Sequence, residues 1–255
     1  MEFGVCAPIE QAPVVHAAGY DFIECTVVSL QAERSDAEVR DRLAQFTESP
    51  VPVAAFNVML PGDLKIVGER VDEARVRRYL EKALERVKRA GGATVVFGSG
   101  KARAVPDGFA REKAEEQIVR FLEWTADVAD PLGVTIAIEP LNMAECNIIT
   151  TVPEAVRFAR HVNRRSIRVL ADFYHMRKDG EPYSHVIEHR ELLHHVHVAD
   201  TRRFVPAEGD EAFDAFAECV RRANYDGRLS VECSWNRFEE EAAAGLNYLK
   251  RIFPA

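Results

Sequence analysis

Short apolar runs alternate with long amphipathic stretches along this chain. The clearest short run, residues 134–139, is rich in β-branched residues and stops abruptly on Glu139, which is typical of a parallel strand buried on both faces. The clearest amphipathic stretch is 73–89, where apolar residues recur at helical spacing and Gly91 supplies the stop. By the same reasoning, strands are expected at 3–7, 22–27, 51–57, 93–97, 134–139, 167–172, 195–197 and 229–232.

Helical patterns occupy the intervals between these runs. We expect helices at 36–46, 73–89, 111–129, 153–162, 211–223 and 236–252, after a short first helix that ends near Ala18. Strand and helix alternate over the whole length without a low-complexity linker, which predicts a single (β/α)₈ TIM-barrel domain spanning residues 1–255. The length of 255 residues suits such a barrel, and a hydrophobic fraction of 47% allows a large core.

Four successive strands in the second half end on a residue that can bind a metal ion. These residues are Glu139, Asp172, His197 and Glu232. Consecutive tips lie roughly 25 to 35 residues apart, which matches one strand-plus-helix unit. The C-terminal tips of barrel strands open at one face, where three carboxylates would repel one another unless a cation lay between them. The pattern therefore predicts a divalent metal, with Mn²⁺ favoured by the oxygen-rich set and Mg²⁺, Co²⁺ or Zn²⁺ as alternatives.

Charge and cysteine content narrow the class of protein further. The formal net charge of −8 opposes attraction to phosphate backbones and anionic membranes, so neither nucleic acid nor a membrane is expected as a partner. No stretch approaches the roughly 18 apolar residues of a membrane span. The five cysteines contain no C-x-x-C pair, which favours reduced thiols, and we expect a cytoplasmic protein.

The motifs around the strand tips resemble a known family. Three stretches carry the resemblance: residues 138–142 with Glu145, residues 172–176, and residues 195–197 running on to Arg203. On these motifs the chain resembles the xylose isomerase-like TIM barrels, and among them the ketose 3-epimerases that act on D-tagatose or D-psicose. The resemblance implies a metal bound by Glu139, Asp172, His197 and Glu232, an acid–base pair formed by Glu139 and Glu232, and substrate contacts from Glu145, His175 and Arg203.

The implied activity is that of a metal-dependent sugar isomerase or epimerase. Such an enzyme removes a proton next to a carbonyl and passes through an enediolate, and its ligand would be a small sugar or sugar phosphate. Ketose 3-epimerase is favoured because Glu145 and Arg203 match the epimerase-like pattern. An inosose-type polyol dehydratase and a hydroxypyruvate isomerase stay open as alternatives, as do a non-enzymatic sugar-binding sensor and a homo-oligomer. A multi-zinc DNA-repair endonuclease is not expected, because His16 is the only histidine before His161.

Further side chains are candidates for the neighbourhood of the site. Glu24 and Asn57, on the second and third strands, are expected at the pocket, and Arg103 is expected to touch substrate. His195 shares a strand face with His197, so we expect it to support that ligand rather than to bind the metal. Residues 98–101, GSGK, resemble a phosphate-binding loop but lack its spacing, and we interpret them as a loop bordering the pocket.

Overall fold

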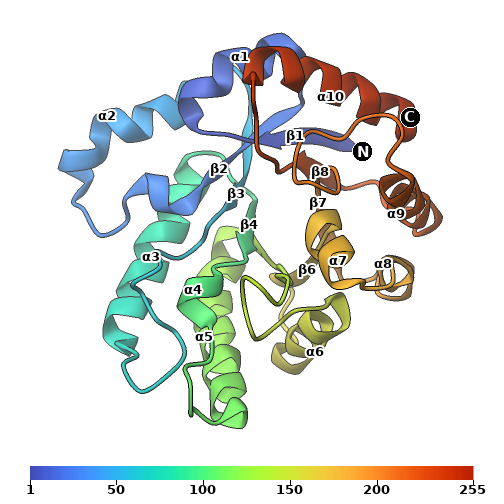
Figure 1. The fold of residues 1–255 in the computed structure, drawn as a ribbon. Coiled ribbons are helices and arrows are strands. Elements are labelled where there is room, and N and C mark those ends of the chain that lie inside the picture. The colour runs from blue at the N-terminus through green and yellow to red at the C-terminus, as the bar shows by residue number, and fades with distance from the viewer. Residues whose placement is uncertain (255) are drawn as a thin grey trace.

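The computed structural model describes residues 1–254, and within them eight parallel strands close into a barrel (Figure 1). The strands follow one another in sequence order, and β8 pairs with β1 to complete the ring. The predicted fold class, a (β/α)₈ barrel of the xylose isomerase type, is confirmed. The strands are β1 (Glu2–Cys6), β2 (Phe22–Thr26), β3 (Val53–Asn57), β4 (Thr94–Phe97), β5 (Thr135–Ile138), β6 (Ile167–Asp172), β7 (Leu193–Val198) and β8 (Arg228–Val231).

Helices surround the barrel on its outer side (Figure 1). The long helices match the predicted stretches, whereas the short α4, α7 and α8 were not predicted. The helices are α1 (Ala12–Ala18), α2 (Asp36–Thr47), α3 (Glu73–Arg89), α4 (Gly100–Arg103), α5 (Arg111–Leu132), α6 (Val152–Val162), α7 (Phe173–Asp179), α8 (Ser184–Glu188), α9 (Glu211–Arg222) and α10 (Phe238–Ile252), with 3₁₀ turns η1 (Ile9–Gln11) and η2 (Val27–Leu30).

The main helix boundaries follow from local chemistry. Asp72 caps α3 by accepting a hydrogen bond from the backbone N–H of Arg75. Helix α5 runs three residues beyond its predicted end, because Pro131 is accommodated in the last turn and Gly133 ends the helix instead. Gly133 has a φ of 64° and donates its N–H to carbonyls of the last turn, a conformation that suits glycine.

The inside of the barrel changes from apolar to polar along the strands. Two small apolar clusters lie apart from the main core, one of them formed by Val96, Ala137 and Leu170. Other interior positions carry polar side chains that are wholly buried; these are Glu24, His195, His197 and Ser230. The polar group forms the floor beneath the C-terminal tips of the strands. Among residues 1–254, no helix is long and apolar enough to cross a membrane.

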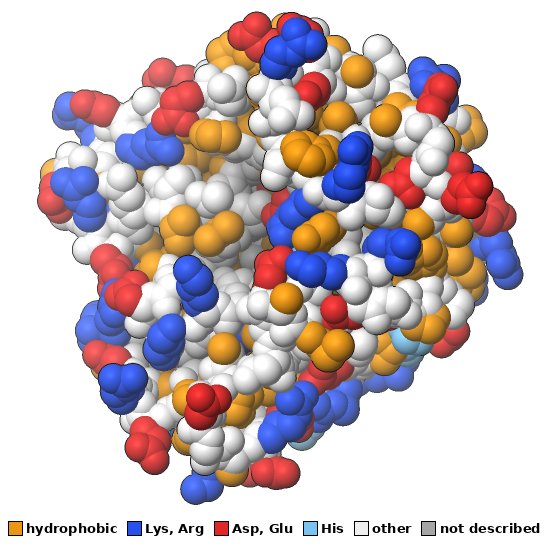
Figure 2. All heavy atoms as spheres, viewed as in Figure 1, with side chains coloured by type: hydrophobic (Ala, Val, Ile, Leu, Met, Phe, Trp, Pro, Cys, Tyr) orange, Lys and Arg blue, Asp and Glu red, His pale blue; other side chains and the backbone are white. Residues whose placement is uncertain are grey.

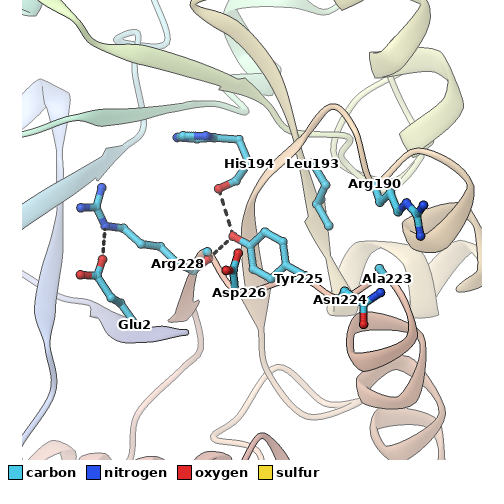
Figure 3. A pocket seen from close by; sticks show the side chains of 10 residues that line it. Glu2, Arg190, Leu193, His194, Ala223, Asn224, Tyr225, Asp226 and Arg228 are labelled. Carbon is cyan, nitrogen blue, oxygen red and sulfur yellow. Dashed lines mark hydrogen bonds and ion pairs between the residues drawn. The ribbon is translucent and has the colours of Figure 1, made fainter. Parts of the chain in front are cut away.

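A cavity of about 390 Å³ lies at the opposite end of the barrel, around the starts of β7 and β8 (Figure 3). The hydroxyl of Tyr225 donates to the carbonyls of His194 and Arg228, and the Arg228 guanidinium pairs with Glu2. Glu2, Tyr225 and Arg228 are thus joined to one another or to nearby backbone. Barrel enzymes carry their chemistry at the other face, so the strand tips are the place to look for a functional site.

Candidate functional site

The tips of β5, β6, β7 and β8 bring the four predicted ligands together. Nδ1 of His197 lies 3.3 Å from Glu139 Oε1, 3.8 Å from Asp172 Oδ2 and 3.7 Å from Glu232 Oε2. The pairing of β6 with β7 sets Asp172 directly beside His197. Figure 2 shows the molecule hollowed at the centre of the ring, with acidic and basic side chains gathered at one side of the hollow. The structure thus places the four side chains around one point, while their metal-binding role stays a prediction.

His175 lies closer to this group than the sequence indicated. Glu139, Asp172, His175 and Glu232 can each offer one ligand atom, and the four atoms lie within 4.8 Å of one another. His175 stands in the first turn of α7, where its backbone N–H donates to Asp172 Oδ1. Its Nδ1 lies 2.7 Å from the side-chain amide nitrogen of Asn142. His175 is therefore positioned beside any ion or ligand held by the three carboxylates.

The donor atoms at the centre fit a divalent cation. Glu139 Oε1 and His197 Nδ1 are buried and have no hydrogen-bond partner in the described part of the chain. Buried polar groups without partners destabilise a fold, and neighbouring carboxylates repel one another. A cation such as Mn²⁺ would relieve both, because it takes carboxylate oxygens and imidazole nitrogen as ligands.

The two glutamates of this group differ electrostatically in the metal-free protein. Burial raises the pKa of Glu232 to about 7, and the charges of Glu139 and Asp172 act in the same direction. Burial also acts on Glu139, but the adjacent His197 outweighs it and holds the pKa of Glu139 below its ordinary value. Two carboxyl groups with separated proton affinities are the arrangement found in acid–base pairs.

Glu232 is held by two donors, one at the end of β3 and one in the loop after β7. The side-chain amide of Asn57 donates to Glu232 Oε1 at 3.1 Å, and Arg203 Nη2 donates to Oε2 at 3.2 Å. Arg203 also donates to Glu145 Oε1 at 3.0 Å, and its guanidinium lies 4.8 Å from the centre of the Tyr174 ring. The expectation that Asn57 lies at the pocket agrees with this contact. The predicted substrate contacts Glu145 and Arg203 thus form one connected group with the carboxylates.

Two sequence expectations about nearby charged residues are wrong. Arg103 does not face the pocket: its side chain is fully buried and donates to the backbone carbonyls of Phe97 and Glu139. Glu24 does not reach the pocket rim either, because it lies in the barrel interior and contacts His195 and His197. Burial acts to raise the pKa of Glu24, but the two histidines lower it below its ordinary value. Both residues support the site from below.

Gly98 is a site residue that the sequence reasoning missed. A Cβ atom built on Gly98 would lie 2.1 Å from Glu139 Oε2, so any larger residue requires this carboxylate to move. The available signal was its position directly after the β4 run, at the tip next to Glu139. The GSGK segment thus borders the site, as predicted, and its first glycine leaves the space that the Glu139 carboxylate occupies.

Comparison with known proteins decides the family. A model of the xylose isomerase-like TIM barrel family matches residues 13–252. This chain belongs to that family. The predicted resemblance is therefore confirmed, and the similar proteins described next are named as sugar epimerases.

Three relatives illustrate the similarity. The 3-dehydro-D-guloside 4-epimerase of Escherichia coli (strain K12) is 29% identical over 178 residues, which are 65% of this chain and 67% of that protein. The ketose 3-epimerase of Arthrobacter globiformis is 30% identical over 108 residues, covering 42% of this chain and only 37% of that protein. The structure of D-allulose 3-epimerase from Methylomonas sp. in complex with D-allulose superimposes with a TM-score of 0.85 at 21% identity, covering 99% of this chain and 97% of the other.

Proposed function

We propose that this protein is a divalent-metal-dependent sugar epimerase that inverts C3 of a ketose. The observation that carries the proposal is the placement of Glu139 and Glu232 on separate strands around the bare Nδ1 of His197. Similarity to proteins named ketose 3-epimerase and D-psicose 3-epimerase supports the substrate class. The ligand is then a small free or phosphorylated sugar.

The metal in this proposal is held by the four residues at the strand tips. Glu139, Asp172 and Glu232 supply oxygen, and His197 supplies Nδ1. Mn²⁺ is the favoured ion because three of the four donors are carboxylates. When bound, such a cation polarises the substrate carbonyl and offsets the negative charge that develops on its oxygen.

The protein's own side chains move the protons. Glu232 takes the proton from the carbon next to the carbonyl, and the electron pair of that C–H bond moves into the carbonyl to give an enediolate. Glu139, which carries a proton at the start of this direction of the reaction, then delivers it to the other face of the same carbon, the carbonyl is restored, and the centre is inverted. Glu232 keeps the proton that it took, and the reverse reaction runs with the two roles exchanged. Positioned proton transfer of this kind contributes about 10²- to 10⁴-fold to the rate. Glu145, His175 and Arg203 hold the sugar over the pair.

We also propose that residues 1–255 act as a single barrel domain in the cytoplasm. Free thiols support this location, because disulfides are rare in the reducing cytoplasm. All five cysteines are free: Cys6, Cys25, Cys146, Cys219 and Cys233.

Chelation followed by add-back tests the proposed function. The protein is stripped of metal, verified by elemental analysis, and incubated with a panel of free and phosphorylated ketoses and hydroxypyruvate. We expect no turnover without metal, and a C3 epimer by NMR after Mn²⁺ or Co²⁺ is restored, with Ca²⁺ less effective. Full activity of the metal-free protein contradicts the mechanism. Loss of water with a new keto group identifies a dehydratase, and sugar binding without turnover identifies a sensor.

A further inference from the structure

A closed hydrogen-bonded cluster lies inside the barrel beneath the candidate metal site. At its centre is Glu24 of β2, which is fully buried. Glu24 Oε1 lies 2.9 Å from His197 Nε2, and Oε2 lies 2.8 Å from His195 Nε2. The hydroxyl of Ser230 donates to the same Oε2 at 2.7 Å. One carboxylate from β2 therefore connects side chains of β7 and β8 across the interior.

This cluster fixes which nitrogen of His197 carries a proton. An ionised carboxylate only accepts hydrogen bonds, so the nitrogen that faces Glu24 must be the N–H of the ring. Nε2 of His197 is then the donor, and Nδ1 has a free lone pair in the neutral ring. Nδ1 is the atom that faces Glu139, Asp172 and Glu232 and lacks a partner in residues 1–254.

We propose that Glu24 is a positioning residue that sets the metal-binding tautomer of His197, and that His195 and Ser230 hold the Glu24 carboxylate in place. This inference rests on the proposed function, because it concerns the affinity of the same site for a cation. It assigns a role to the H-x-H pattern of β7: His197 reaches the tip, whereas His195, one pleat below, fixes the carboxylate that orients it. The rings of the two histidines lie 5.1 Å apart and nearly perpendicular.

Replacing Glu24 by glutamine separates this role from simple filling of space. Glu24→Gln keeps the size of the side chain but turns one acceptor oxygen into an NH₂ donor. The new NH₂ group points at the N–H of His195 or His197 unless that ring moves its proton to its other nitrogen. In His197 such a move puts the proton on Nδ1, the nitrogen proposed to bind the metal. Loss of a carboxylate that orients a metal-bound histidine typically weakens metal binding about 10- to 100-fold. We expect a loss in this range for Glu24→Gln.

Two control variants accompany this substitution. Ser230→Ala removes one of the three hydrogen bonds to Glu24 and leaves both histidine contacts, so its effect on metal affinity should be severalfold smaller. Glu181→Gln alters another buried glutamate, which pairs with His185 at 2.8 Å instead of with a histidine of the site. It should leave metal affinity unchanged even though it disturbs a comparable buried pair.

The experiment is a calorimetric titration of Mn²⁺ into the metal-free wild-type protein and each variant, with circular dichroism as the check on folding. Nitrogen-15 NMR of the histidine rings in the Mg²⁺-loaded wild type gives a second readout, which does not depend on whether Glu24→Gln folds. We expect His197 to show an Nε2–H that exchanges slowly with solvent. The inference is overturned if folded Glu24→Gln binds Mn²⁺ as tightly as the wild type, or if NMR finds the ring proton on Nδ1 of His197. Either result leaves the proposed function standing. A wild-type protein that binds no divalent cation overturns the proposed function as well.

Discussion

Glu232 is the residue on which the proton transfer depends most directly. Glu232→Gln keeps the shape of the side chain but only one of the two oxygens that accept from Asn57 and Arg203, and it cannot take up a proton. We expect the fold to persist and kcat to fall by at least about 10²-fold, the scale for loss of a general base. The control is Glu208→Gln, an exposed glutamate paired with Arg251 that should leave kcat unchanged. A wild-type kcat in Glu232→Gln would assign the base to another residue.

A substitution at Gly98 tests the position of Glu139 without changing the chemistry of that carboxylate. The Cβ of Gly98→Ala would overlap Glu139 Oε2, so the carboxylate must move. Misplacement of a catalytic group by about 1 Å can lower activity about 10²-fold, and we expect a loss of that order with weaker Mn²⁺ binding. Gly62→Ala is the control, because its Cβ would lie no closer than 3.4 Å to the nearest side-chain atom. Undiminished activity and metal affinity in Gly98→Ala would show that Glu139 need not lie where the structure places it.

At the scale of elements, Arg103 of α4 joins the ends of two strands. Its guanidinium donates to the carbonyls of Phe97, Glu139 and Ile149, and no solvent reaches it. Arg103→Met fills similar space but leaves these buried acceptors unpaired, and we expect the free energy of unfolding to fall by at least about 2 kcal/mol. Denaturant unfolding measures this loss. The exposed Arg120, paired with Glu73, is the control, since Arg120→Met should change stability by less than about 1 kcal/mol.

The same elements show what a sequence can and cannot predict here. The strand order was predictable because short apolar runs mark the strands. The convergence of Glu139, Asp172 and His197 was predictable because the C-terminal ends of all strands lie at one face of a parallel barrel. The helices α4, α7 and α8 were missed because four to seven residues are too few to show an amphipathic repeat. Arg103 and Glu24 were placed wrongly for a different reason. Whether a charged side chain points into the pocket or is buried below it depends on partners that are distant in sequence.

For the whole molecule, the account predicts that metal binding stabilises the folded barrel. A cation that binds only the native protein adds about 2.7 kcal/mol at a concentration one hundred times its Kd. We therefore expect Mn²⁺ to raise Tm and a chelator to lower it. Asp172→Asn should abolish the shift, because it removes a proposed ligand charge. Scanning calorimetry with and without Mn²⁺ measures the effect; an identical Tm in both conditions would mean that the carboxylates hold no metal.

Exchange with solvent deuterium tests the central claim most directly, namely that Glu139 and Glu232 exchange a proton at C3 of a ketose. The Mn²⁺-loaded protein is incubated with its ketose substrate in D₂O, and the products are read by NMR. The account predicts deuterium at C3 and formation of the C3 epimer, with both lost in Glu232→Gln. Deuterium at C1 or C2 with an aldose product, or release of water without exchange at C3, would contradict it.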